Sequence, residues 1–145
     1  MLAQHTNRFV REITFTLIEA VFTMAAKKTK KAGKGLEEDQ LARVVKIVSE
    51  GLADNWSQVR MAASKAVRAY FVLQGAYKPE GEEEKEEGSP VKVEEGGFAA
   101  LLLPRVCLNR RYVAEGVRVH AQQTWKRIVH GRGRKVVAGL ASHFA

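Results

Sequence analysis

Apolar residues recur three and four positions apart along most of this 145-residue chain, which is the period of an amphipathic α-helix. The pattern predicts helices over six segments: 7–26, 37–52, 56–74, 97–108, 110–130 and 134–144. No segment alternates apolar and polar residues for long enough to indicate a β-strand. We therefore expect an all-α protein.

Four of the predicted helices carry a clear apolar stripe that should face the core. In the first helix the stripe comprises Val10, Ile13, Leu17, Ala20, Val21 and Met24. In the second it comprises Leu41, Val44, Val48 and Leu52. In the third it comprises Val59, Ala63, Ala66, Tyr70 and Leu73. In the fifth it comprises Val113, Val117, Ala121, Thr124 and Ile128.

Two charged segments interrupt this periodicity. The sequence "KKTKKAGKG" (27–35) is basic and contains two glycines, which predicts a connector. The acidic stretch 75–96 has too little apolar surface to offset the entropy cost of ordering it, so we expect disorder there. Stacked helical repeats tolerate such an insertion, because it projects from one face.

Three predicted helices begin in a similar way. Asn7, Asn55 and Asn109 each precede a valine by three or four residues, and the valines are spaced by about fifty residues. Asparagine is a favoured N-cap because its side-chain oxygen accepts hydrogen bonds from the free amides of the first turn. The spacing indicates a repeated unit in which a tight turn joins two antiparallel helices.

The segment "LARVVKIVSEGLADNWSQVRMAASKAVRAYF" resembles a HEAT repeat: one helix, a short turn with Asp or Asn, and a second helix that opens with Val-Arg. The segment "GFAALLLPRVCLNRRYVAEGVRVHAQQTW" resembles a second unit, although Ala114 replaces the arginine. The resemblance implies stacked antiparallel helix pairs, an α-solenoid of the HEAT/armadillo type.

Read in this way, the chain divides into six parts. They are a second helix of a partial repeat (1–26), a basic connector (27–36), a HEAT-like repeat (37–74), an acidic insert (75–96), a second repeat (97–130) and the first helix of a truncated repeat (131–145). Such a chain lacks polar capping repeats, so we expect a fragment of a longer array that self-associates or is marginally stable alone. The alternative is a helical bundle with a closed core.

The composition restricts the class of partner but does not identify one. The formal net charge of +8 indicates affinity for acidic surfaces. The most apolar stretch, 13–26, is shorter than a membrane-spanning helix requires and contains Glu19, so no membrane partner is expected. The single cysteine, Cys107, excludes an intramolecular disulfide and fits a reducing compartment, cytoplasmic or nuclear.

The sequence contains no pattern typical of catalysis. It has no phosphate-binding loop and no nucleophile elbow, and its four histidines lack metal-ligand spacing. We expect no catalytic, cofactor or metal site, and His120 is interpreted as a packing residue. The protein is therefore predicted not to be an enzyme.

The predicted function is a protein-interaction scaffold that binds a partner on the concave face lined by second helices. The candidate contacts are Trp56, Arg60, Ser64, Arg68, Arg111, Glu115, Arg118 and Gln122. A nuclear-localisation or anion-binding cluster is a further candidate: Lys27, Lys28, Lys30, Lys31 and Lys34. Two alternatives remain: a tubulin-associated HEAT module that uses Trp56 and basic residues, and a weak, non-specific nucleic-acid binder.

Overall fold

The computed structural model describes residues 1–32, 36–77, 91–93 and 96–141. Within these residues it contains helices and no β-strand, which confirms the all-α class. The elements are η1 (Leu2–Gln4), α1 (Arg8–Ala32), α2 (Glu38–Gly51), α3 (Ser57–Leu73), α4 (Phe98–Asn109), α5 (Glu115–Val129) and α6 (Gly133–Gly139). None of the described helices is both long and apolar enough to cross a membrane.

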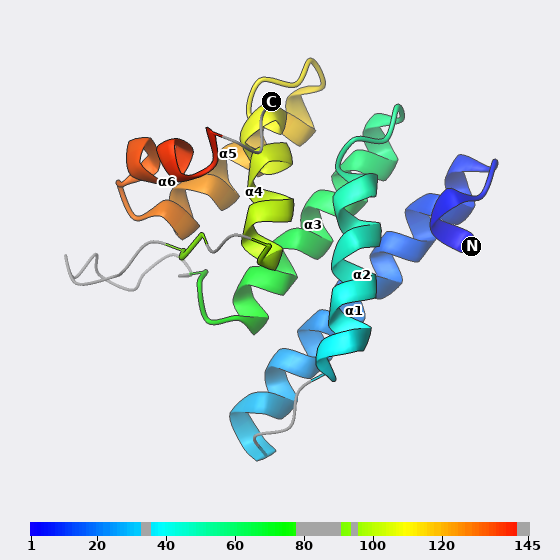
Figure 1. The fold of residues 1–145 in the computed structure, drawn as a ribbon. Helices are drawn as coiled ribbons and strands as arrows, with labels where there is room; N and C mark the ends of the chain where they lie inside the picture. Colours follow the sequence, from blue (N-terminus) through cyan, green and yellow to red (C-terminus); the bar gives the residue numbers. More distant parts are fainter. Residues whose placement is uncertain (33–35, 78–90, 94–95, 142–145) are drawn as a thin grey trace.

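The helices lie in two layers (Figure 1). α3 packs between α1 and α5 in one layer, while α2 and α4 pack against each other in the second layer. Across the layers α2 contacts α3 and α4 contacts α5. Four buried or nearly buried alanines of α3, at 62, 63, 66 and 69, allow its neighbours to approach closely.

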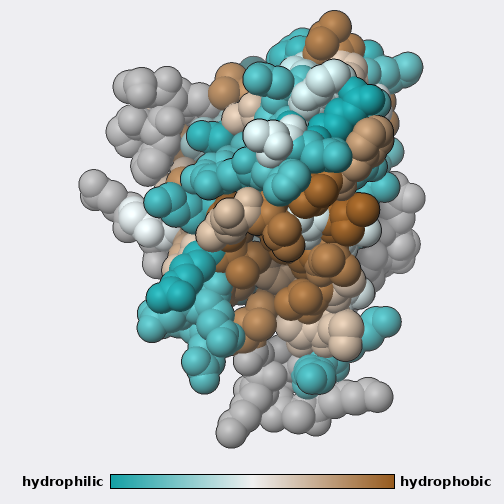
Figure 2. Space-filling view, turned by 90° about the vertical axis from the view of Figure 1, so that its right-hand side faces the viewer, coloured by the Kyte–Doolittle hydropathy of each residue, from teal (hydrophilic) through white to brown (hydrophobic). Residues whose placement is uncertain are grey.

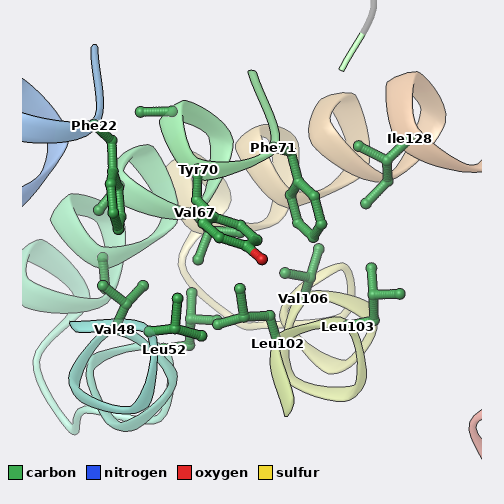
Figure 3. Packing of buried hydrophobic residues seen from close by; sticks show 14 of the residues in the cluster. Phe22, Val48, Leu52, Val67, Tyr70, Phe71, Leu102, Leu103, Val106 and Ile128 are labelled. Carbon is green, nitrogen blue, oxygen red and sulfur yellow. The ribbon is translucent and has the colours of Figure 1, made fainter. Parts of the chain in front are cut away.

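Large apolar side chains fill the space between the two layers. Val67 and Tyr70 of α3 point toward Leu52 and Leu102 on the opposite layer (Figure 3). The ring of Tyr70 also lies 5.8 Å from that of Phe22, and burial raises the pKa of the Tyr70 hydroxyl to about 12. This cluster holds α1 and α3 against α2 and α4.

The first helix differs from the prediction in the face that it buries. Phe15, Phe22 and Ala25 are buried, whereas most of the stripe predicted from the sequence is exposed. The exposed residues are Ile13, Leu17, Ala20, Val21 and Met24. α1 is apolar on two faces, and the aromatic face packs inward because Gly51 of α2 admits the Phe15 ring, which a Cβ at position 51 would overlap.

The first helix is also longer than predicted. α1 continues to Ala32, so the basic segment that begins at Lys27 is helical rather than a connector. Lysine, alanine and threonine are compatible with a helix, and the first glycine of the segment is Gly33. Residues 33–35 lie outside the described part of the chain.

An asparagine N-cap was predicted for three helices and is present in one of them. The amide of Phe9 donates to Oδ1 of Asn7 at 2.9 Å, as expected of a cap. At the next turn the amide of Trp56 donates to Asp54 rather than to Asn55. Asn109 is the last residue of α4, and α5 begins only at Glu115.

Most of the predicted disordered insert, 75–96, lies outside the described residues, but residues 75–77 and 91–93 are described. Tyr77 and Val91 pack against the core, and the amide of Val91 donates to the carbonyl of Ile128 at 3.0 Å. The expectation of disorder is therefore wrong for these two short segments. The physical reason is that these positions carry aromatic and branched apolar side chains that α3 and α5 can cover.

An ion pair fastens α1 to the turn between α2 and α3. Nε of Arg11 donates to Asp54 at 2.8 Å, and NH2 donates to the other carboxylate oxygen at 3.1 Å. Burial alone would raise the pKa of Asp54, but hydrogen bonds from Arg11 and the Trp56 amide, with the charges of Arg11 and Arg60, lower it below its ordinary value. This bidentate pair orients the turn that begins α3.

Candidate functional site

A groove runs over α3 between α1 and α5, on the face of α3 opposite Val67 and Tyr70. It consists of two hollows of about 730 and 340 Å³, and both are lined by Glu19 and Lys65. α1 supplies one wall and α5 supplies the other. The groove therefore crosses the whole α1–α3–α5 layer.

The floor of the groove consists of the narrow sector of α3 that neither neighbour covers. Gln58, Lys65 and Val72 are exposed there, and Met61 is half-buried between them. The floor is open at Met61 because α5 carries Gly116, where a Cβ would lie 2.9 Å from the Met61 methyl group. The floor thus presents apolar and basic side chains together.

The groove contains charges of both signs. Glu12 and Glu19 lie on the α1 wall, whereas Lys65 and Arg68 project from the floor toward the α5 side. Lys27 adds a further positive charge near the C-terminal end of α1. A ligand with charges of both signs would match this distribution.

His120 on the α5 wall is a neutral polar group at neutral pH. Burial, together with the positive charges of Arg68 and Lys65, lowers the pKa of its imidazole to about 4. Nε2 of His120 is buried and has no hydrogen-bond partner among the described residues. The sequence interpretation of His120 as a packing residue agrees with its burial but overlooked its position in the groove wall.

We expect the imidazole of His120 to titrate near pH 4 in the folded protein, compared with an ordinary value of 6.5. Because the folded-state pKa is the lower one, the unfolded chain binds more protons between these values. The contribution of His120 to stability is therefore complete above pH 6.5 and is lost as the pH falls toward 4. NMR titration of the imidazole signals, assigned with His120→Gln, measures this pKa; a value near 6.5 would contradict it.

Two of the predicted contact residues on α3 make contacts within the protein instead of facing a partner. Arg60 donates from NH1 to Oδ1 of Asn109 at 2.8 Å, and its guanidinium lies 3.9 Å from the centre of the Tyr112 ring. Ser64 is buried, and its hydroxyl donates to the carbonyl of Arg60 at 2.8 Å. Neither residue lies on an exposed face, because the end of α4 and the α4–α5 turn cover Arg60, and α5 covers Ser64.

Arg68 both lines the groove and joins the helices that form it. Its Nε donates to the hydroxyl of Thr124 at 2.9 Å, and NH2 donates to the carbonyl of His120 at 3.1 Å. These bonds hold the guanidinium against α5. Of the three predicted α3 contacts, Arg68 is the one that the structure places in the groove.

Of the predicted contact residues near α5, two make internal hydrogen bonds and two are exposed. Arg118 donates to the carbonyl of Tyr112 at 3.2 Å, and Gln122 donates to that of Arg110 at 3.2 Å, so both stabilise the turn between α4 and α5. Arg111 and Glu115 are exposed. None of these four residues lines the two hollows of the groove.

Trp56 lies at the start of α3 and is 46% exposed. The guanidinium of Arg8 lies 4.1 Å from its ring, within the range of a cation–π interaction. The residue is therefore on the rim of the molecule, away from the two hollows.

Four of the five lysines of the predicted cluster belong to the last turns of α1. Lys27 and Lys28 are exposed on α1, and Lys27 reaches the groove. The backbone of Lys30 and Lys31 belongs to the last turn of α1, and Lys34 lies outside the described residues. A role of the cluster in nuclear import stays a prediction.

The sequence analysis missed the groove residues Glu12, Glu19 and Met61. One signal could have indicated the floor: Gln58 and Lys65 are seven residues apart, a spacing that places them on the same face of α3. The walls carried no comparable signal, because Glu12 and Glu19 look like ordinary polar positions of an amphipathic helix.

Comparisons with known proteins leave the chain without an assigned relative. No protein-family description, no curated protein and no solved structure matches it significantly. Its function must therefore be inferred from its own residues.

Proposed function

We propose that this chain is a non-enzymatic protein-interaction scaffold of the HEAT-repeat type, which binds a segment of a partner protein in the groove. In this interpretation α2–α3 and α4–α5 are the two helix pairs. α1 takes the role of a further second helix, and α6 that of a further first helix. The observation that carries the proposal is that the three assigned second helices, α1, α3 and α5, are the ones that line the groove.

The chemistry of the groove indicates what such a segment would present. Lys65 and Lys27 favour acidic side chains on the partner, and Glu12 and Glu19 favour a basic one. Met61, Ala69 and Val72 offer apolar contact between the charges. A peptide with acidic residues, one basic residue and one large apolar residue fits this surface best.

Lys65→Glu tests the proposal, and Lys126→Glu is its matched control. Lys65 lies in the groove, whereas Lys126 is exposed on α5 outside it. Peptides selected from a displayed random library against the wild-type protein should bind Lys65→Glu at least about tenfold more weakly, since a like charge then faces their acidic residues. They should bind Lys126→Glu within about twofold of wild type.

Fluorescence anisotropy of the labelled peptides measures both affinities. Equal binding to the two variants would place the binding surface elsewhere, and failure to select any peptide would contradict the scaffold proposal. Thermal melting of both variants should match that of the wild type, because both lysines are exposed.

The exposure of Trp56 favours a second candidate, a tubulin-associated module in which an acidic tubulin surface meets the α2–α3 turn. Trp56 and Arg8 form an aromatic and basic pair on that rim. Co-sedimentation with microtubules that is lost in Trp56→Ala but retained in Lys65→Glu would support this candidate over the groove.

A further inference from the structure

α1 carries a stripe of large apolar side chains that the described part of the chain leaves uncovered. The stripe consists of Phe9, Ile13, Leu17, Val21 and Met24, which are 58%, 60%, 59%, 47% and 60% exposed. Steps of three and four residues place them on one face of the helix. Figure 2 views the molecule from the side on which the N-terminal half of α1 lies, and hydrophobic side chains gather over this face.

The charged residues of α1 lie on the flanks and at the ends of this stripe, and the guanidinium of Arg8 lies 4.9 Å from the centre of the Phe9 ring. Between Phe9 and Met24 the ionisable residues are Arg11, Glu12 and Glu19. Arg11 is paired with Asp54, and the two glutamates line the groove. The stripe is thus a continuous apolar surface with charge on its flanks, which is typical of a protein-binding face.

We propose that this stripe binds a second copy of the chain, with the two α1 helices antiparallel about a twofold axis at Leu17. The order of side chains along the stripe is nearly the same in both directions. Leu17 is central, β-branched Ile13 and Val21 lie four residues to either side, and the long Phe9 and Met24 lie at the ends. A twofold interface requires such self-complementarity, because each residue meets its counterpart from the reversed helix.

Charge selects the antiparallel arrangement over the parallel one. Lys27 and Lys28 are exposed at the C-terminal end of α1. Parallel helices would bring the four lysines of two copies together, which is unfavourable. Antiparallel helices separate them instead into two pairs, one at each end of the interface, each beside Thr6, Asn7 and Arg8 of the other copy.

The area of the stripe suits a modest dimer. Five large side chains with about half their surface exposed offer on the order of 500 Å² per copy. A standard interface buries about 800 Å² per partner. The flanking Ala20, also exposed, extends the contact toward that size. The dimer leaves the floor of the groove free, so it is independent of the proposed function.

Sedimentation equilibrium of the full chain tests the proposal with Leu17→Asp and the control Leu108→Asp. Both leucines are exposed to a similar extent, 59% and 62%, and they lie on different faces. We expect a wild-type dimer, an increase of at least about 100-fold in the dissociation constant for Leu17→Asp, and little change for Leu108→Asp. A wild-type monomer, or a dimer insensitive to Leu17→Asp, would overturn the proposal.

Cysteine cross-linking in a Cys107→Ser background tests the twofold axis. Under oxidation, Leu17→Cys should form covalent dimers, whereas Met24→Cys alone should not, because residue 24 meets the opposite end of the other helix. Mixing Met24→Cys with Phe9→Cys should restore the cross-link. Self-linking of Met24→Cys as readily as of Leu17→Cys would mean parallel helices and would overturn the arrangement. Absence of a wild-type dimer, together with weaker peptide binding by Lys65→Glu, would reject this inference and leave the proposed function of the groove standing.

Discussion

Replacement of Phe22 by alanine is expected to lower the free energy of unfolding by about 3–5 kcal/mol. Phe22 is fully buried, and its ring lies 5.8 Å from that of Tyr70 (Figure 3). Truncation removes the transfer free energy of the ring and leaves a cavity that three packed helices cannot close. Urea denaturation followed by circular dichroism measures the loss.

Phe9→Ala is the matched control, because Phe9 belongs to the same helix and is 58% exposed. It should cost less than about 1 kcal/mol. Both substitutions are best measured in the Leu17→Asp background, so that self-association does not contribute. If Phe9→Ala cost more than Phe22→Ala, the buried face of α1 would be the one predicted from the apolar stripe, and the observed packing would be wrong.

Asn109→Ala is expected to destabilise the protein by about 2–4 kcal/mol. Asn109 is 1% exposed at the end of α4. Its Nδ2 donates to the carbonyl of Leu52 at 3.0 Å, and its Oδ1 accepts from NH1 of Arg60 at 2.8 Å. One side chain thus joins α4 to α2 and α3, and its removal leaves the Leu52 carbonyl and NH1 of Arg60 without the partner that Asn109 provides.

The exposed Asn55 provides the comparison for Asn109. Asn55→Ala should change the free energy of unfolding by less than about 0.5 kcal/mol. A similar cost of about 1 kcal/mol for both substitutions would instead indicate two N-caps, as the sequence pattern suggested. A double-mutant cycle with Arg60→Ala would isolate the part of the loss that belongs to the Arg60–Asn109 hydrogen bond.

The sequence predicted the buried faces of α2 and α3 well, because polar residues occupy the other faces of both helices. On α2 the exposed Arg43, Lys46 and Glu50 confine burial to the side of Leu41, Val48 and Leu52. On α3 four of the five residues expected to be buried are buried, and Leu73 is partly buried. One amphipathic face is enough to orient a helix against a core.

The same reasoning chose the wrong face of α1, because that helix is apolar on two sides. Periodicity detects both the Ile13–Leu17–Val21 stripe and the Phe15–Phe22 pair, and it contains no information about which side has a neighbour. The space beside Gly51 determines which face of α1 is buried, since it accepts the Phe15 ring. This space is created by α2 and is invisible in the sequence of α1.

The groove lies on α1, α3 and α5, but most of the contact residues expected on α3 and α5 do not line it. Arg60, Ser64, Arg118 and Gln122 make internal hydrogen bonds. Polar residues at helical spacing look the same whether they face water or a neighbouring helix. Arginine in particular can bury its stem and donate to carbonyl groups across an interface.

By itself, the sequence determined that the chain is helical, how its apolar residues are spaced and that a tight turn follows Gly51, because these follow from local periodicity and turn chemistry. The tertiary structure alone decided which face of α1 is buried, that Asn109 links three helices, and which side chains of α3 remain in the groove. Each of these depends on the neighbours of a helix on both sides, and those neighbours are set by contacts between residues far apart in the chain.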